Sequence, residues 1–291
     1  MTLGAGRLYF KADGSYTTGT RVLGGVLSAS GDVDIDTPFT MNAGASILTD
    51  GAITFSSTVN LNTGTGVLTL RGSAIDFSGA TLNNLSTASI RLEPADASTS
   101  MVVGDSNGFV SASKLSLLSG IKNLTIGRED GTGTISLASD FSFSASGALE
   151  LVNKTIDISA GTLTNTSGNI TLSGDNINIV KTVTANGGNG TVTLRQEGAG
   201  TELHLGSTLA SSSISEINAA TLVIGRANGG DVVFDGDIST NANAVHIISG
   251  GKVEGINGGV SAANVAVTAA GGATRDWSQR CLHVGHPRKQ S

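Results

Sequence analysis

Two groups of closely spaced aspartates are the residues of this chain that could perform acid–base chemistry. Paired carboxylates act as general acid and general base in glycoside hydrolysis, where they must converge in one groove. Alternate acids on an outward strand face are more commonly solvated, and they also keep strand edges from aggregating. We therefore predict solvated strand residues and assign no catalytic role to either group: Asp32, Asp34 and Asp36, and Asp231, Asp235 and Asp237.

Three other patterns contain residue types that bind metal ions or ice. Gly229–Asp237 is similar to the calcium-binding nonapeptide of β-solenoids, but it lacks the third glycine and is not repeated in tandem. Cys281, His283 and His286 are metal-ligand types at an incomplete spacing. Threonine pairs could form an ice-binding ladder, although threonine also simply favours strands; these pairs are Thr162/Thr164, Thr182/Thr184 and Thr191/Thr193. We predict no metal and no cofactor, with calcium and ice binding as minor alternatives.

The remaining histidines and the glycine-rich stretches complete no catalytic motif. His204 and His246 occupy alternate positions within apolar segments, so each is expected to face solvent between inward neighbours. No Ser/His/Asp nucleophile motif is present, and the glycine-rich stretches lack the GK[ST] ending of a phosphate-binding loop. The sequence therefore predicts a protein that is not an enzyme.

Apolar residues in pairs, with one residue between the two members, recur along most of the chain. Glycine or asparagine interrupts nearly every interval between pairs, which a long helix would not tolerate. Short strands with alternate residues pointing inward explain the pattern better. The pairs are Ile75/Phe77, Ile90/Leu92, Leu124/Ile126, Phe141/Phe143, Leu149/Leu151, Ile156/Ile158, Ile170/Leu172, Ile177/Ile179, Val192/Leu194, Leu203/Leu205, Leu222/Ile224, Val232/Phe234, Val245/Ile247 and Val265/Val267.

Strands of this length suit the coils of a solenoid. Three of them make one coil of roughly 20–25 residues, and successive coils pair edge to edge at a spacing of ~4.8 Å. About a dozen coils would form a rod roughly 55–65 Å long. The predicted fold is an all-β, single-stranded parallel β-helix, which analogy makes right-handed.

A block of the form L-x-I-G-R occurs twice, at Leu124–Arg128 and at Leu222–Arg226. The copies lie about 98 residues apart, and the segments before them also match. The repetition predicts a super-repeat of about 98 residues between residues 90 and 240, or roughly four to five coils. Arg128 and Arg226 should then occupy equivalent outer-face positions and should not be catalysts.

The composition supports a narrow core and argues against some partners. Glycine accounts for 41 of 291 residues, aromatic residues for 4% and charged residues for 14%. The net charge of −6 opposes nucleic-acid binding, which needs clustered lysine and arginine. No apolar run approaches the roughly 20 residues that span a membrane.

The chain divides near Gly271 and Gly272. Residues 1–272 are predicted to form the β-helical shaft. Residues 273–291 lose the apolar alternation and contain the only Trp and the only Cys, so we expect a disordered tail that is foreign to the solenoid. The first residues lack the basic and apolar regions of a signal peptide, so any export signal is expected outside this chain.

Two segments around the second block carry a family resemblance. Ile214–Phe234 and Val245–Ile256 resemble repeats of filamentous-haemagglutinin-like exoproteins, the large secreted adhesins of bacterial two-partner secretion. The resemblance extends over roughly residues 1–270. It implies a right-handed β-helix, export through a partner outer-membrane β-barrel, and a role at the bacterial cell surface. A host or cell-surface glycan or protein would be the receptor.

Residues and resemblance together predict a structural or adhesive shaft segment without catalysis. The alternative is a carbohydrate-active β-helix enzyme of the polysaccharide-lyase kind. Such an enzyme would need convergent carboxylates, or arginine and lysine pairs, in a groove on one face.

Overall fold

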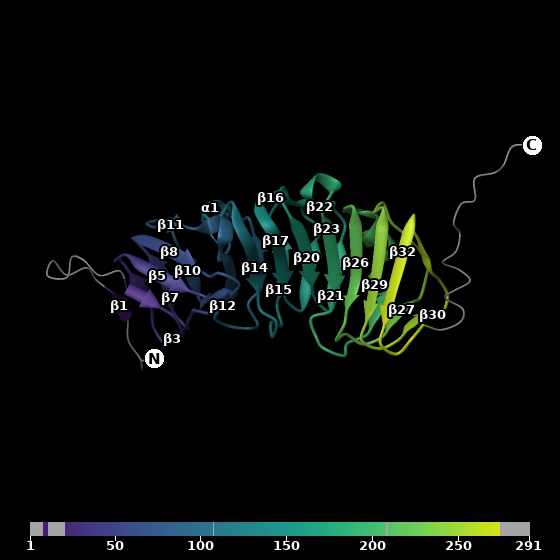
Figure 1. Ribbon diagram of the computed structural model, residues 1–291, viewed down its shortest axis with the longest axis horizontal. Helices are drawn as coiled ribbons and strands as arrows, with labels where there is room; N and C mark the ends of the chain where they lie inside the picture. Colours follow the sequence, from purple (N-terminus) through teal and green to yellow (C-terminus); the bar gives the residue numbers. More distant parts are fainter. Residues whose placement is uncertain (1–7, 11–20, 107, 208, 274–291) are drawn as a thin grey trace, which may run out of the picture.

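The computed structural model describes residues 8–10, 21–106, 108–207 and 209–273, which form a parallel β-solenoid (Figure 1). One strand from each of eleven coils joins a single in-register sheet, which we call the long face. Its strands are β3 (Val26–Ala29), β6 (Ser46–Thr49), β9 (Leu68–Gly72), β12 (Ser89–Pro94), β14 (Ile121–Gly127), β17 (Ala145–Val152), β20 (Asn169–Ser173), β23 (Thr191–Arg195), β26 (Thr221–Arg226), β29 (Ala244–Ser249) and β32 (Asn264–Ala269).

The second face of the coil is divided into three shorter parallel sheets. The first contains β1 (Leu8–Phe10), β4 (Val33–Ile35), β7 (Ala52–Phe55) and β10 (Ala74–Asp76). The second contains β13 (Met101–Val103), β15 (Thr134–Leu137), β18 (Thr155–Ile158) and β21 (Asn176–Ile179). The third contains β24 (Leu203–Leu205), β27 (Val232–Phe234) and β30 (Val253–Gly255).

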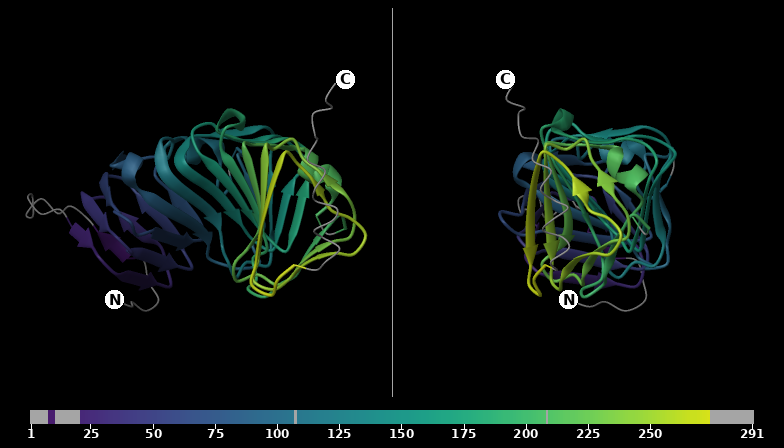
Figure 2. Two further views of the ribbon diagram at one scale, coloured as in Figure 1. Left: turned by 45° about the vertical axis from the view of Figure 1, so that its right-hand side comes forward. Right: turned by 90° about the vertical axis from the view of Figure 1, so that its right-hand side faces the viewer.

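The third face is divided in the same way. Its sheets are β2 (Arg21–Leu23), β5 (Phe39–Asn42), β8 (Thr58–Asn62) and β11 (Thr81–Asn83); then β16 (Phe141–Phe143), β19 (Leu163–Asn165), β22 (Val183–Ala185) and β25 (Ile217–Asn218); and last β28 (Ile238–Ser239) with β31 (Val260–Ser261). Figure 2 shows the three faces end on, wrapped around one core. The prediction of a parallel solenoid with three strands to a coil is confirmed for most coils.

Two coils are longer than the predicted 20–25 residues. Along the long face Leu92 pairs with Ile126, 34 residues later, and Leu194 pairs with Ile224, 30 residues later. The extra length holds the short helices α1 (Ala112–Ser116) and α2 (Ser211–Ser215), which bury Leu115 and Ile214 respectively. These coils coincide with interruptions of the second face, because β10 and β13, like β21 and β24, belong to different sheets.

The two L-x-I-G-R blocks of the super-repeat lie four coils apart in the structure. Strand β14 carries the first L-x-I-G-R block and β26 carries the second, and four strand spacings separate them on the long face. Each block follows a helix-bearing coil, so the duplication extends to the loops. Ten spacings of about 4.8 Å make the described rod about 48 Å long, which is shorter than the sequence estimate.

The core consists of aliphatic ladders that run along the rod. Register pairs each inward residue with its equivalent in the next coil, as in Leu149, Ile170 and Val192. All the predicted inward pairs are buried except Val265/Val267, which are partly buried on β32, the last described strand. Two phenylalanines, Phe55 and Phe77, stack with ring centroids 5.2 Å apart.

The predicted tail lies mostly outside the described residues. Ala273 forms a parallel bridge with Val253, and residues 274–291 follow it. Cys281, His283 and His286 therefore lie outside the described part. Among the described residues, the helices are too short to span a membrane.

Candidate functional site

Outward side chains of the long face form a charged row. Because neighbouring strands are in register, the residue between each pair of inward apolar residues stacks on its equivalent. The pairing places Arg91 beside Thr125, Thr125 beside Glu150, and Glu150 beside Thr171. These residues come from four coils, so the row exists only when the coils stack.

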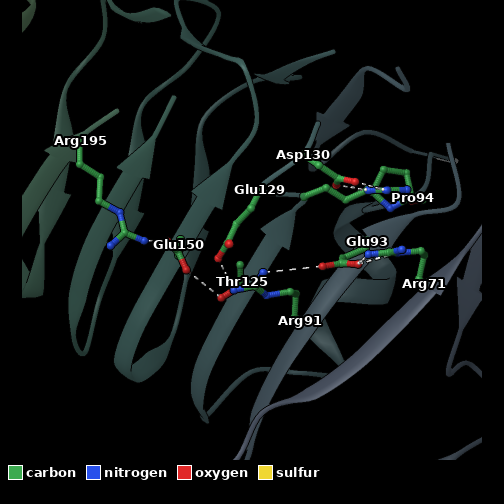
Figure 3. A network of polar contacts seen from close by, with 10 residues as sticks. Arg71, Arg91, Glu93, Pro94, Thr125, Glu129, Asp130, Glu150 and Arg195 are labelled. Atoms are coloured by element: carbon green, nitrogen blue, oxygen red, sulfur yellow. Dashed lines mark hydrogen bonds and ion pairs between the residues drawn. The ribbon is translucent and has the colours of Figure 1, made fainter. Parts of the chain in front are cut away.

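Arginines and glutamates in and beside this row neutralise one another on the long face (Figure 3). Glu93 is buried, and Arg71 donates to its Oε2 from Nε at 2.7 Å and approaches it with Nη2 at 2.6 Å. Arg91 lies 3.7 Å from the other oxygen of Glu93 and 3.1 Å from Glu129. A buried carboxylate with a guanidinium partner avoids the large cost of an isolated buried charge.

A second ion pair lies further along the same face. Arg195 Nη2 reaches across β20 to Glu150 Oε1 at 2.5 Å, and Arg195 Nε donates to Ser173 Oγ at 3.3 Å. The other oxygen of Glu150 accepts from Thr125 Oγ1 at 3.0 Å. Both oxygens of Glu150 therefore have hydrogen-bond donors.

A hollow of about 380 Å³ opens over the row. Arg91 and Arg195 line it, with Glu150 between them, and small polar or methyl groups from Thr125 and Ala148 complete part of the lining. Four strand spacings separate the two arginine-bearing strands, or about 19 Å at ~4.8 Å each. The residues that line the hollow therefore follow one another along the rod, and the Arg195 guanidinium reaches back across β20 to Glu150.

Sequence reasoning missed this row because its members are far apart in the chain. The Arg71–Glu93 pair spans 22 residues and the Arg195–Glu150 pair spans 45. A signal was present nonetheless for two of these residues, because Arg91 lies between Ile90 and Leu92, and Glu150 lies between Leu149 and Leu151. Aligning the predicted inward pairs of successive coils would have placed these charged residues on one face.

The twin arginines clamp one coil to the one before it. Arg128 Nη1 donates to the carbonyl oxygens of Pro94 at 3.2 Å and Ala95 at 2.7 Å. Arg226 Nη1 donates to the carbonyl oxygens of Gln196 at 3.1 Å and Glu197 at 2.7 Å. The predicted equivalence is therefore confirmed.

The predicted outer-face position is wrong for Arg128, which is only 7% exposed. The preceding glycine, Gly127, has a φ of +105°, and this conformation turns the chain so that the arginine enters the corner. Its guanidinium also binds Asp130 with two contacts, at 2.8 and 2.6 Å. That contact holds the pKa of Asp130 below its usual value and raises the pKa of Arg128.

The first aspartate group is partly buried, contrary to prediction. Asp34 is only 6% exposed, although Asp32 is exposed. Tyr9 pairs with Asp34 in register, and its hydroxyl donates to Asp36 Oδ2 at 2.9 Å, so the tyrosine side chain runs along this strand. Asp32 accepts from the backbone N–H of Ala52 at 2.9 Å, which ties two coils together.

The second aspartate group also serves neighbouring coils. Asp231 accepts from the N–H of Lys252 at 2.7 Å, and Asp237 accepts from the N–H of Gly259 at 3.1 Å. These carboxylates lie in the Gly229–Asp237 segment that is similar to a calcium motif, and here they accept bonds from the next coil. Asp140 likewise accepts a hydrogen bond from the next coil, and this bond from the Thr162 N–H lowers the pKa of the Asp140 carboxyl group.

His204 is paired with two carboxylates. Its Nδ1 lies 2.9 Å from Asp235 Oδ2, and its Nε2 lies 3.3 Å from Glu202 Oε2. Ser207 donates to the same Asp235 oxygen, at 2.5 Å. The serine thus contacts the aspartate and not the histidine, so these contacts do not form a nucleophile triad. Outward orientation is confirmed, since Leu203 and Leu205 are buried on either side.

No protein-family model matches the chain, and no curated protein sequence or solved structure matches it either.

Proposed function

We propose that this chain is a shaft segment of a large secreted bacterial surface exoprotein of the filamentous-haemagglutinin-like kind, and that it mediates attachment or cell contact without catalysis. The observation that carries the proposal is the uninterrupted long face, an eleven-stranded sheet whose aliphatic ladders continue through both helix-bearing coils. Such a stack forms a continuous shaft that keeps its two ends a fixed distance apart, because each coil packs against its neighbours.

The proposal includes a cellular setting. The full-length protein would leave the cell through a partner outer-membrane β-barrel and would act at the cell surface. Its receptor would be a glycan or protein on a host or another cell. The resemblance of Ile214–Phe234 to exoprotein repeats supports this setting.

Binding of the purified chain to cells and to a glycan array tests the adhesive part. We expect retention that weakens when the hollow loses its guanidiniums, in the Arg91→Ala/Arg195→Ala double variant. Lys122→Ala is the matched control, because Lys122 is exposed on β14 of the same sheet and does not line the hollow. Absence of retention, or equal loss in the control, would count against attachment through this face.

One observation favours the second candidate, a carbohydrate-active enzyme. The hollow brings two arginines and a carboxylate onto one face, which partly meets the requirement for a polysaccharide-cleaving groove. Glu150, however, is the one carboxylate in this lining among the described residues, and Arg195 and Thr125 occupy its oxygens. Incubation with a panel of acidic polysaccharides decides the question, since new chain ends that disappear in Glu150→Gln would overturn the non-catalytic proposal.

A further inference from the structure

A second hollow, of about 510 Å³, lies at a corner of the solenoid beside the first helix-bearing coil, and we call it the corner hollow. Three successive coils contribute to its lining. Asp50 follows β6, and Ser73 follows β9. Asp96, Thr99 and Phe109 come from the longer coil that follows β12. A hollow of this size suits a small molecule or one side chain, which a few polar groups and an aromatic ring can orient.

Phe109 lies in a loop that is three residues longer than its equivalent four coils later. In the first loop the Gly104 N–H donates to the Val110 carbonyl oxygen at 3.0 Å, with five residues between them. In the second, the Gly206 N–H donates to the Leu209 carbonyl oxygen at 2.8 Å, with two residues between them. A short helix begins two residues after each carbonyl. The turn therefore closes without the longer loop, and the fold does not require Phe109.

Hydrogen bonds hold the longer loop in place. Asp105 Oδ1 accepts from the Gly108 N–H at 2.7 Å, and Lys114 Nζ donates to the Gly108 carbonyl oxygen at 3.3 Å. Phe109 is half-buried and packs against the core, while its exposed part lines the corner hollow. The hollow thus has an aromatic wall whose position is fixed before any ligand arrives.

The two carboxylates of the corner hollow lack a positive partner. Asp50 and Asp96 are exposed, and among the described residues neither has an ion-pair partner. Hydrogen bonds from the Ser98 N–H at 2.8 Å and the Ser98 hydroxyl at 2.9 Å hold the pKa of Asp96 below its usual value. Arg128 attracts Asp96 more weakly, and its guanidinium is bound to Asp130. The hollow therefore carries an uncompensated negative charge at neutral pH.

The equivalent corner four coils later has a different chemistry. Register aligns Ile47 with Leu92 through β9, and Leu151 with Leu194 through β20. Counted from these residues and from the turn before each helix, the sequence places a lysine, a glycine and a threonine where the corner hollow has its two aspartates and its ring. The replacements are Lys154 for Asp50, Gly198 for Asp96 and Thr208 for Phe109. Stacking of the coils therefore requires neither the carboxylates nor the ring.

We propose that the corner hollow binds a guanidinium group, presented by an arginine side chain of a partner protein. A carboxylate accepts two parallel hydrogen bonds from a guanidinium, and the planar group stacks on an aromatic face. The positive charge compensates Asp50 and Asp96, which a neutral ligand would leave uncompensated. A lysine ammonium offers the charge without the planar fork, so it should bind less tightly. This site lies away from the hollow on the long face and does not depend on attachment through that face.

A nuclear magnetic resonance titration of the intact chain tests the chemistry. The probes are acetyl-Gly-Arg-Gly-amide, the citrulline peptide of the same shape without the charge, and the lysine peptide. The arginine peptide should cause saturable shifts of the amide signals of Asp96, Thr99 and Phe109, with a Kd on the order of 1 mM. The citrulline peptide should bind at least about tenfold more weakly, and the lysine peptide should lie between them. Equal binding of the citrulline peptide, or no saturable shift at these residues, would overturn the proposal.

Variants that copy the later corner test the site. Asp96→Gly/Phe109→Thr should lower the affinity for the arginine peptide about tenfold or more. Asp50→Lys changes only an exposed side chain, so it tests the charge without altering the packing, and it should weaken binding in the same direction. Asp157→Asn is the matched control, because it removes a carboxylate on β18 that does not line the corner hollow. Unchanged binding in both corner variants, or an equal loss in the control, would overturn the assignment.

Discussion

At the scale of single residues, the twin L-x-I-G-R blocks have a physical explanation. The leucine and isoleucine fill the core, and the glycine turns the chain so that the arginine can contact the preceding coil. Gly127 and Gly225 have φ values of +105° and +85°, a region that side-chain-bearing residues rarely adopt. The arginines then satisfy pairs of carbonyl oxygens that belong to the corner before them.

Replacement of Gly127 by alanine should destabilise the solenoid by about 2 kcal/mol or more. The added methyl would adopt a strained backbone conformation and would collide with the Val152 carbonyl oxygen of the next coil. Urea denaturation followed by circular dichroism measures the loss. Gly24→Ala is the control, since open space surrounds Gly24, and equal losses in the two variants would contradict the explanation.

The histidine cluster predicts a small pH dependence. The hydrogen bond to Asp235 is the main cause that raises the pKa of His204, and Glu202 adds to it. Its stabilisation is therefore complete below the ordinary histidine pKa of about 6.5, and it is lost as pH rises through the folded-state pKa. His204→Gln should lower stability only at the acidic end, by less than about 1 kcal/mol, because the pair is partly exposed.

Denaturation midpoints at several pH values measure this difference. His246→Gln is the control, because His246 contacts the Thr268 hydroxyl at 3.0 Å. A His204→Gln deficit that grows with rising pH would contradict the assignment.

At the scale of elements, short strands are stable here because those inside a sheet are covered on both edges by an equivalent strand. Single strands of three to five residues are marginal, and stacking supplies the missing partners. The helices α1 and α2 are equally short, and they are held by burial of Leu115 and Ile214 and not by helix propensity.

Replacement of Ile158 by aspartate should open the coils around β18. Ile158 is fully buried and pairs with Ile179, so a carboxylate there would be buried without a partner, at a cost above about 4 kcal/mol. Limited proteolysis should show new cuts in β15, β18 and β21. The neighbouring Asp157→Asn faces outward, bonded to Asn178, and should leave the cleavage pattern intact. An unchanged pattern in Ile158→Asp would show that the inward assignment is wrong.

At the scale of the whole molecule, the rod behaves as a one-dimensional stack. The long face is continuous, whereas the second and third faces are interrupted at the helix-bearing coils. Interactions thus pass mainly between adjacent coils, and stability should be close to a sum of coil and interface contributions.

Double-mutant cycles distinguish distant from adjacent coils. Ile47→Ala and Ile224→Ala lie on β6 and β26, seven strand spacings apart, so their effects should add within about 0.5 kcal/mol. Leu151→Ala and Leu172→Ala are register partners, and their effects should deviate from the sum by roughly 0.5–3 kcal/mol. Hydrogen-exchange protection measures the local free energies. Strong coupling between the distant pair would contradict the one-dimensional picture.

The sequence by itself determined the coil pattern, because inward and outward alternation is a local property of each strand. Leu149 and Leu151 are buried as predicted, and so are their equivalents along the ladders. Similarity between the two blocks was also enough to place Arg128 and Arg226 in equivalent positions. These inferences hold because each coil repeats the inward and outward residue pattern of its neighbour.

Only the tertiary structure decided what happens at the corners. Arg128 and Asp34 are buried because the path of one coil covers a side chain of another. The Arg195–Glu150 pair likewise joins residues 45 positions apart. Periodicity indicates which way a side chain points from its own strand. It carries no information about how far a loop in the next coil reaches, and that reach sets burial, partners and charge state.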